Sequence, residues 1–210
     1  MKINKLKLYN IIMYILILVI VITLTLIVMK YALSYKNEKY KANMLTSIYD
    51  TIHIYNESIN NPNTVIKEEA QDVIIPNLTY KGYPVIGIIK INKINLEYPI
   101  IDDASARALN QSIVKYAGCN VGEIGNICLA GHNNLNDTMF GKVDNLEIGD
   151  VITLISMSGE IIEYKILQKY VTVPEDIGCI RPLDKNKREV TLITCTNRSK
   201  NRLIIKAQEI

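Results

Sequence analysis

Thr191-Leu192-Ile193-Thr194-Cys195 is a run of apolar and β-branched residues that ends at a cysteine, and it decides how this chain folds. Such a run is typical of a β-strand, and the polar residues 196–201 that follow it predict a turn. A second strand-like run covers 202–207 and opens with Arg202. Two strands joined by a short turn are antiparallel neighbours, so we expect Cys195 and Arg202 side by side at one end of a sheet. A thiol beside a permanent cation is a candidate nucleophile, because positive charge favours the thiolate.

The composition limits what the protein can be. With 210 residues, the chain has room for one domain of ordinary size and an appendage. Its formal net charge of +3 is small and its basic residues form no stripe, which argues against a nucleic-acid partner. Because there is no Trp and only one Phe, the core must be built from Ile, Leu, Val and Tyr.

The four cysteines form no C-x-x-C pair, and their spacing with the two histidines matches no common zinc pattern. A chain of this length can bury a core without disulfides. We therefore expect Cys119, Cys128 and Cys179 to be buried as small apolar residues, and we expect no cofactor.

The N-terminal segment predicts a membrane anchor. Residues 8–29 carry no charge, and all but Tyr9, Asn10 and Tyr14 are Ile, Leu, Val, Met or Thr. As a helix rising about 1.5 Å per residue, the segment is about 33 Å long, enough to cross a hydrocarbon core of about 30 Å. A signal peptide would have a shorter apolar region and a small-residue cleavage site. An uncleaved anchor is therefore the better interpretation, and a buried core helix is the alternative.

We expect four parts in the chain: a cytoplasmic tail over 1–7, a transmembrane anchor over 8–29, a partly helical stalk over 30–80 and a catalytic domain over 81–210. Lysines flank both ends of the anchor, so their count does not settle the orientation. Long domains translocate largely regardless of charge, which favours a single-pass membrane protein with the domain outside the cell.

Within the stalk, Met44, Leu45, Ile48 and Ile52 lie on one side of a predicted helix over 40–55. A second short helix is predicted over 65–73. The domain shows short β-rich runs separated by turns, which predict an all-β barrel or sandwich. These strands are predicted over 85–91, 96–101, 126–130, 151–156, 161–173, 190–194 and 203–207. A helix over Ser105–Val114, capped by Asp102 or Asp103, and a helical turn over 138–146 complete the prediction.

A thiol nucleophile needs a partner that transfers protons, usually a histidine. The chain offers two. His53 lies in the polar stalk and is interpreted as a surface residue. His132 follows Leu129-Ala130-Gly131 just past a strand end, where the glycine lets the backbone approach a substrate closely. His132 is therefore the candidate acid and base, with an incidental loop histidine as the alternative.

Together these residues resemble the sortases, the cysteine transpeptidases of Gram-positive cell surfaces. The family has an alanine-glycine-histidine strand end and a T-L-x-T-C strand end followed by arginine, and both occur here in order, around His132 and Cys195. The resemblance covers roughly 85–207 and includes the Gly149-Asp150 turn. It implies a closed β-barrel of about eight strands with short helices, preceded by a transmembrane helix.

The resemblance also implies roles. Cys195 would attack the threonine carbonyl of a Leu-Pro-x-Thr-Gly-like sorting signal and form a thioester. His132 would protonate the leaving amine and deprotonate the incoming one, and Arg202 would hold the substrate and the oxyanion. Arg198 is a rival for the arginine role, but it lies in the turn, whereas Arg202 directly precedes the last strand.

The implied substrate-binding residues flank these three: Ala130, Gly131 and Thr194. The resemblance places the sorting peptide in a groove bordered by the loop Pro174–Glu189. The implied partners are surface proteins that bear a C-terminal sorting signal, and a peptidoglycan precursor or cross-bridge amine. No acidic cluster of the kind that calcium-binding members carry is evident, so we expect no required metal.

Two further features bear on the subclass and on the alternatives. The chain has no Asp-Pro lid motif and ends at Ile210 soon after the last strand, which favours anchoring of proteins to the cell wall over pilus assembly. The short turn from Cys195 to Arg202 resembles class B or D. The alternatives are a hydrolytic cysteine peptidase with the same dyad, and a non-catalytic membrane-tethered β domain that binds wall partners.

Overall fold

The computed structural model describes residues 5–60, 78–196 and 200–210. The chain divides into two compact units, Met1–Asn43 and Met44–Ile210. The long helix α1 (Lys5–Asn60) belongs to the first unit up to Asn43 and to the second unit from Met44 onward.

In the first unit, α1 presents an apolar surface on all sides. Its Ile, Leu, Val and Met side chains between Leu8 and Met29 are exposed, and α1 is long and apolar enough to cross a membrane. The two threonines of this stretch satisfy their hydroxyls within the helix: Thr23 Oγ1 donates to the Ile20 carbonyl at 2.8 Å and Thr25 Oγ1 to the Ile22 carbonyl at 2.7 Å. Hydroxyls bonded in this way are compatible with a hydrocarbon environment.

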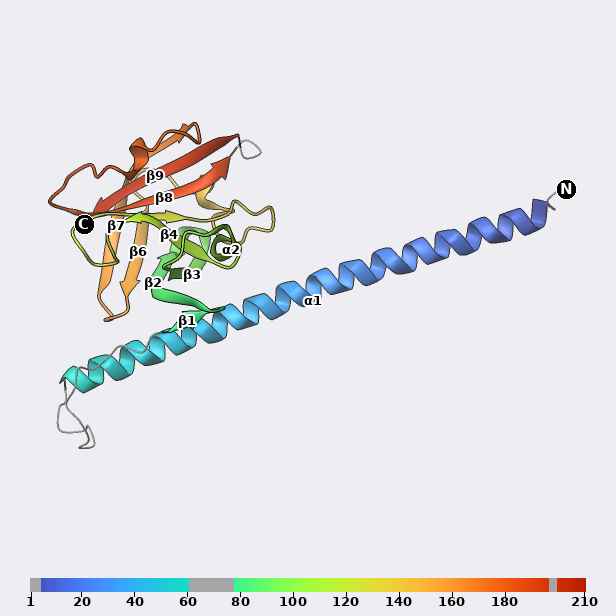
Figure 1. The fold of residues 1–210 in the computed structure, drawn as a ribbon, viewed down its shortest axis with the longest axis horizontal. Helices are drawn as coiled ribbons and strands as arrows, with labels where there is room; N and C mark the ends of the chain where they lie inside the picture. The colour runs from blue at the N-terminus through green and yellow to red at the C-terminus, as the bar shows by residue number, and fades with distance from the viewer. Residues whose placement is uncertain (1–4, 61–77, 197–199) are drawn as a thin grey trace. The chain divides into compact units, whose positions relative to one another are not determined.

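The second unit is a closed barrel of eight strands, which confirms the predicted fold (Figure 1). The neighbouring strands follow the order β2-β3-β4-β5-β8-β9-β7-β6, and pairing of β6 with β2 closes the ring. The two-residue strand β1 pairs with β2 only. The pairs β3–β4 and β5–β8 are parallel, and the others are antiparallel. The strands are β1 (Thr79–Tyr80), β2 (Tyr83–Ile91), β3 (Leu96–Ile101), β4 (Ile113–Gly118), β5 (Gly125–Ala130), β6 (Val151–Ser156), β7 (Ile161–Thr172), β8 (Arg188–Thr196) and β9 (Asn201–Glu209).

Alternating side chains fill the barrel. On β8, Val190 and Leu192 point into the main core, so Thr191, Ile193 and Cys195 point to the outer face. The main core combines aliphatic side chains with Phe140 and Tyr164, both of which are buried. The prediction that Ile, Leu, Val and Tyr build the core is confirmed.

One predicted helix is wrong over half of its length. Helix α2 covers only Ala106–Leu109, and Ser105 caps it by accepting a hydrogen bond from the Ala108 amide at 3.2 Å. The residues after the helix turn into β4, which pairs in parallel with β3 through Ile100 and Ile113. Burial of Ile113 and Val114 in the sheet therefore prevails over the four-residue spacing that suggested a helix. Among the described residues, the other short helices are η2 (Asn92–Ile94), η3 (Val143–Asn145) and η4 (Gly178–Ile180).

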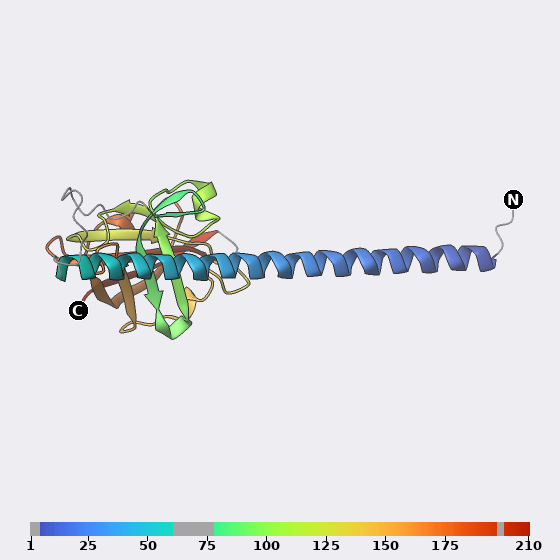
Figure 2. The same cartoon turned by 90° about the horizontal axis from the view of Figure 1, so that it is seen from below.

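The C-terminal part of α1 covers one outer face of the barrel (Figure 1 and Figure 2). Leu45, Ile48 and Ile52 are buried in a second core, against Ile88 of β2 and Ile155 of β6. The predicted helical face over 40–55 is confirmed. The short helix predicted over 65–73 lies outside the described residues.

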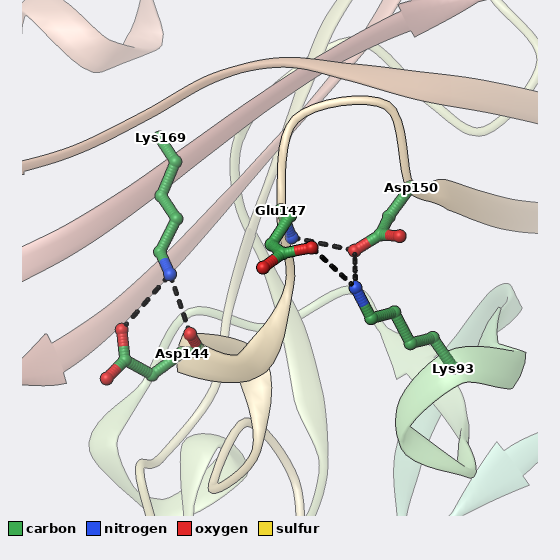
Figure 3. A network of polar contacts seen from close by, with 5 residues as sticks. All are labelled: Lys93, Asp144, Glu147, Asp150 and Lys169. Carbon is green, nitrogen blue, oxygen red and sulfur yellow. Dashed lines mark hydrogen bonds and ion pairs between the residues drawn. The ribbon is translucent and has the colours of Figure 1, made fainter.

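A polar network fixes the turn that leads into β6 (Figure 3). The carboxylate of Asp150 accepts from the Glu147 amide at 2.7 Å and from the Lys93 ammonium at 2.8 Å. The hydrogen bond from Lys93 and the one from the backbone lower the pKa of Asp150. Nearby, Lys169 donates to the Asp144 carbonyl at 2.6 Å. The Gly149-Asp150 turn is therefore a structural feature of the barrel.

Candidate active site

Cys195 and Arg202 lie opposite each other on the antiparallel strands β8 and β9, which confirms their predicted pairing. Both residues point to the outer face, where they are partly exposed. Arg202 also donates through Nη1 to the Asn201 carbonyl at 3.2 Å. Strand register alone therefore brings the thiol and the guanidinium to one end of the sheet.

The segment after β5 is fastened to the same end of the sheet. The Gly131 amide donates to the Ile193 carbonyl at 3.2 Å, and the buried Thr194 hydroxyl donates to the Gly131 carbonyl at 2.7 Å. On the other side of His132, the Asn133 side chain donates to the Cys195 carbonyl at 2.9 Å. Hydrogen bonds on both sides of His132 thus hold it beside the strand that carries the cysteine.

Packing explains why a glycine precedes the histidine. A Cβ atom at Gly131 would lie 2.7 Å from Cδ2 and 3.0 Å from Cγ of Phe140. The Phe140 ring is fully buried in the main core, and its amide donates to the His132 carbonyl at 3.0 Å. The backbone before His132 therefore lies directly against a core aromatic ring, which leaves no room for a side chain.

A hydrogen bond orients the imidazole. His132 Nε2 lies 2.9 Å from Oδ1 of Asn110, which is the C-cap residue of α2. An amide oxygen only accepts, so Nε2 carries the hydrogen in this pair and Nδ1 is the acceptor nitrogen of the neutral ring. Sequence reasoning missed Asn110, because nothing in the pattern links it to a histidine 22 residues away.

Cys195, His132 and Arg202 line a cavity of about 260 Å³ on the outer face of β8 and β9. All six predicted site residues are among its lining: Cys195, His132, Arg202, Ala130, Gly131 and Thr194. The hydroxyl of Thr194 is already bonded to the Gly131 carbonyl, so this side chain faces the backbone and supports the cavity wall. The rival residue Arg198 lies outside the described residues.

The walls of the cavity are largely apolar. Leu109, Val114, Ile193 and Ile204 contribute apolar side chains. The loop between β7 and β8 contributes Pro174, Asp176, Ile177, Cys179 and Ile180. An apolar cleft with a few convergent polar groups is the usual form of a site for a peptide or small ligand.

The other three cysteines lie in different environments. Cys128 is fully buried, and desolvation raises its pKa to about 12. Cys179 is also buried, and burial raises its pKa as well. The expectation of burial is wrong for Cys119, which is partly exposed and packs against the edge of the main core. Within the described ranges, no three His, Cys, Asp or Glu side chains are grouped so as to hold a metal ion.

A closed barrel that presents a thiol, an imidazole and a guanidinium in one apolar cleft has the composition of a cysteine-dependent acyl-transfer site. The sortase family model, described as "Sortase domain", matches residues 89–210, which is more than half of the chain. The chain belongs to the sortase family, as its motifs predicted.

Similar proteins agree with this assignment. The chain is 34% identical over 110 residues to Sortase D of Bacillus subtilis (strain 168), a match that covers 52% of this chain and 53% of the relative. It is 29% identical over 124 residues to Sortase A of Bacillus anthracis, covering 59% of this chain and 58% of the relative. The chain thus spans little more than half the length of these curated relatives.

Among solved structures, the Sortase D5 transpeptidase of Clostridium perfringens matches with a TM-score of 0.62 and 27% identity, over 82% of this chain and 99% of that chain. The C. perfringens sortase C solved with the C-terminal cell wall sorting motif matches with a TM-score of 0.55 and 25% identity, over 84% of this chain and 95% of that chain. Class D relatives in both comparisons agree with the class D part of the expectation.

Proposed function

We propose that this protein is a membrane-anchored cysteine transpeptidase that cleaves an LPxTG-like C-terminal sorting signal after its threonine and transfers the protein to a cell-wall amine. The single observation that carries the proposal is the cavity in which Cys195, His132 and Arg202 meet, brought together from separate strand ends. The sortase family membership and the sorting motif named for the C. perfringens sortase C support the substrate class.

In the first half of the proposed reaction, the Cys195 thiolate attacks the threonine carbonyl carbon. The bond from this carbon to the following nitrogen breaks, and protonated His132 gives its proton to the leaving amine. A thioester between the threonine and Cys195 remains. The proton comes from Nδ1, because Nε2 is engaged with Asn110.

In the second half, a primary amine attacks the thioester. Neutral His132 takes a proton from this amine, the carbon–sulfur bond breaks, and the thiolate re-forms. In both halves an oxyanion develops on the threonine carbonyl oxygen, and the Arg202 guanidinium is the cation beside it. Removal of one oxyanion donor typically costs about 2.7–4 kcal/mol, so Arg202 contributes a large part of the rate acceleration.

The apolar helix fits this reaction at a cell surface. We propose that residues 8–29 form a single membrane span, that 1–7 form a cytoplasmic tail, and that the stalk over 30–80 and the domain over 81–210 lie outside the cell. The length and apolar surface of α1 support the anchor. Partners on the outer side would be proteins with a sorting signal and a peptidoglycan amine.

The test uses the full chain in detergent with a fluorogenic sorting peptide. Wild type is expected to release the C-terminal fragment, and Cys195→Ala to reduce the rate to background. Cys119→Ala removes a thiol that is also partly exposed and serves as the matched control, with activity expected to stay near wild type. Equal losses in both variants would show that the wrong cysteine was assigned.

Product analysis separates transfer from hydrolysis. A primary amine such as triglycine or diaminopimelate is expected to give the peptide–amine conjugate as the main product. A free threonine carboxylate at every amine concentration would identify a hydrolytic cysteine peptidase. A full set of sorting peptides left intact, together with no trapping of Cys195 by a thiol reagent, would favour the non-catalytic wall-binding alternative.

A further inference from the structure

The outer face of β5, β8 and β9 continues beyond the candidate active site. Residues that point outward from these strands align in rows across the sheet, because neighbouring strands are in register and side chains alternate. The two rows near the cleft are catalytic and apolar, and the two rows beyond them are mostly polar. From the cleft outward, the rows are Cys195 with Arg202; Ile193 with Ala130 and Ile204; Thr191 with Cys128 and Lys206; and Glu189 with Asn126 and Gln208.

Most side chains of the polar rows are buried, although they lie on the outside of the barrel. Thr191 is 0% exposed, Lys206 4% and Glu189 1%. A buried charge is costly unless it is hydrogen-bonded. Another segment of the chain must therefore cover these side chains and supply their hydrogen-bond partners.

The covering segment is the loop from Val173 to Lys187, which joins β7 and β8. Lys206 donates through Nζ to the Arg181 carbonyl. The Asn126 side chain donates to the Ile180 carbonyl at 2.9 Å and to the Cys179 carbonyl at 3.4 Å. All three acceptors are backbone groups of η4 or of the residue directly after it.

The remaining polar groups complete the attachment. Thr191 Oγ1 donates to Asn126 Oδ1 at 2.9 Å, which orients the amide toward the loop. The Glu189 carboxylate accepts from the Leu183 and Asp184 amides, each at 2.6 Å. The polar rows therefore bond to residues 179–184 of the loop, through backbone atoms that are independent of the loop's side chains.

The fastened part of the loop is also the wall of the cleft. Ile177, Cys179 and Ile180 line the cavity that contains Cys195, and they belong to η4 or adjoin it. Asp176 orders the start of this turn by accepting from the Gly178 amide at 2.8 Å. Besides Asp176, the side chains that fix the position of this wall are those of Lys206, Asn126 and Thr191, and none of these three lines the cavity.

We propose that Lys206, together with Asn126 and Thr191, is a positioning residue that holds η4 in place as a preformed wall of the peptide groove. The proposal rests on the proposed function and deepens it: binding of an extended, largely apolar peptide depends on these residues, whereas the reactivity of Cys195 does not. A preformed wall lowers the ordering cost of peptide binding, so its loss appears in KM.

The experiment compares full-length wild type with Lys206→Met, which keeps the stem of the side chain and removes the ammonium. Because one hydrogen bond from a charged donor is lost, KM for the sorting peptide is expected to rise about 5–20-fold while kcat stays within about twofold. The rate at which iodoacetamide alkylates Cys195, followed by mass spectrometry of its peptide, is expected to be unchanged, since this small reagent does not use the wall.

Amide hydrogen exchange supplies a reading that does not depend on activity. Residues 177–181 are expected to exchange at least about tenfold faster in Lys206→Met, because local opening becomes easier. Lys169→Met is the matched control: Lys169 also donates to a backbone carbonyl, that of Asp144, away from the cleft (Figure 3). This control is expected to change neither KM nor exchange over 177–181.

Thr191→Val serves as the second variant if Lys206→Met does not fold, and the same rise in KM and in exchange is expected. The proposal is overturned if exchange over 177–181 is unchanged, or if kcat and alkylation of Cys195 fall together with an unchanged KM. If wild type cleaves no sorting peptide, the proposed function fails, and hydrogen exchange alone decides whether these residues hold the wall.

Discussion

Gly131→Ala tests the claim that the backbone before His132 is fixed against the core. The added Cβ would lie 2.7 Å from Cδ2 of Phe140, closer than real Cβ contacts come. The ring cannot move freely, because Phe140 is fully buried in the main core. The strain must therefore be relieved by a shift of the backbone at 131–132, away from the ring.

The expected magnitude follows from this geometry. Overpacking of a close-packed site by one methyl group typically costs about 1–3 kcal/mol. For a unit of this size, each kcal/mol lowers the melting temperature by roughly 2–4 °C, so we expect a decrease of roughly 2–12 °C. A shift at Gly131 also displaces His132 and strains the Thr194 hydrogen bond to the Gly131 carbonyl. We expect kcat/KM to fall at least about tenfold, since displacements below 1 Å are costly at a reacting centre.

Thermal unfolding and peptide cleavage are the assays. A second substitution, Phe140→Leu, is combined with Gly131→Ala to reduce the clash with the ring. The new Cβ would meet Cδ2, Cγ and Cε2 of the ring. Leucine has no counterpart of Cε2, and its smaller side chain can turn its Cδ atoms away, so the double variant is expected to be more stable than the sum of the single changes predicts, by about 0.5 kcal/mol or more. An unchanged melting temperature in Gly131→Ala, or strictly additive effects in the double variant, would refute the argument that the ring positions the histidine segment.

Two further predictions concern the polar partners of the site and of the barrel. Asn110→Ala removes the acceptor of His132 Nε2, so kcat is expected to fall about 5–10-fold with KM within about twofold. The melting temperature is expected to stay within about 2 °C because Asn110 is exposed. An unchanged kcat would count against an orienting role. The Lys93 hydrogen bond lowers the pKa of Asp150 in the folded state, so this carboxylate stabilises the fold above its unfolded pKa of about 3.9 and loses that contribution as the pH falls through the lower folded value. The measurement is the free energy of unfolding of wild type and Asp150→Asn, by denaturant, between pH 7 and pH 2. The difference between the two proteins is expected to be constant above about pH 5 and to shrink below pH 4. A difference that grows on acidification would contradict the stabilising role of the Asp150 carboxylate.

Much of the barrel could be predicted, because its strands carry clear local signals. The runs that became β2 and β3 are β-rich and separated by a short turn, and the run that became β8 ends at a polar stretch. The missed strand, β4, shows the limit of such signals. Leu109 and Ile113 are four residues apart, as on a helix, but Ile113 is buried by parallel pairing with Ile100 of β3. Pairing partners distant in sequence therefore decided what local spacing could not.

The residues that meet in the candidate site could be brought together from the sequence because their motifs stand at strand ends. Arg202 follows the cysteine strand by a short turn, and His132 follows a glycine whose role is visible only in contact with Phe140. Asn110 could not be predicted, since it is an exposed helix cap among several asparagines of the chain. Its position depends on the place of α2 relative to β5, which no local pattern encodes.

The polar rows on the outer face of β8 and β9 show why the residues that support the cleft wall could not be predicted from the sequence. Thr191 and Lys206 alternate with apolar residues along their strands. This alternation distinguishes the two faces of a strand, but it does not indicate which segment covers the polar face. Because a loop that lines the candidate site covers that side, β8 carries both Cys195 and, in the proposed arrangement, a residue that supports the cleft wall. Thr191 and Cys195 are four residues apart on the same face of the strand, about 13 Å. In the proposed arrangement the wall and the thiol are thus attached to the same strand, so a peptide bound against the wall would have its carbonyl held at a fixed distance from the sulfur.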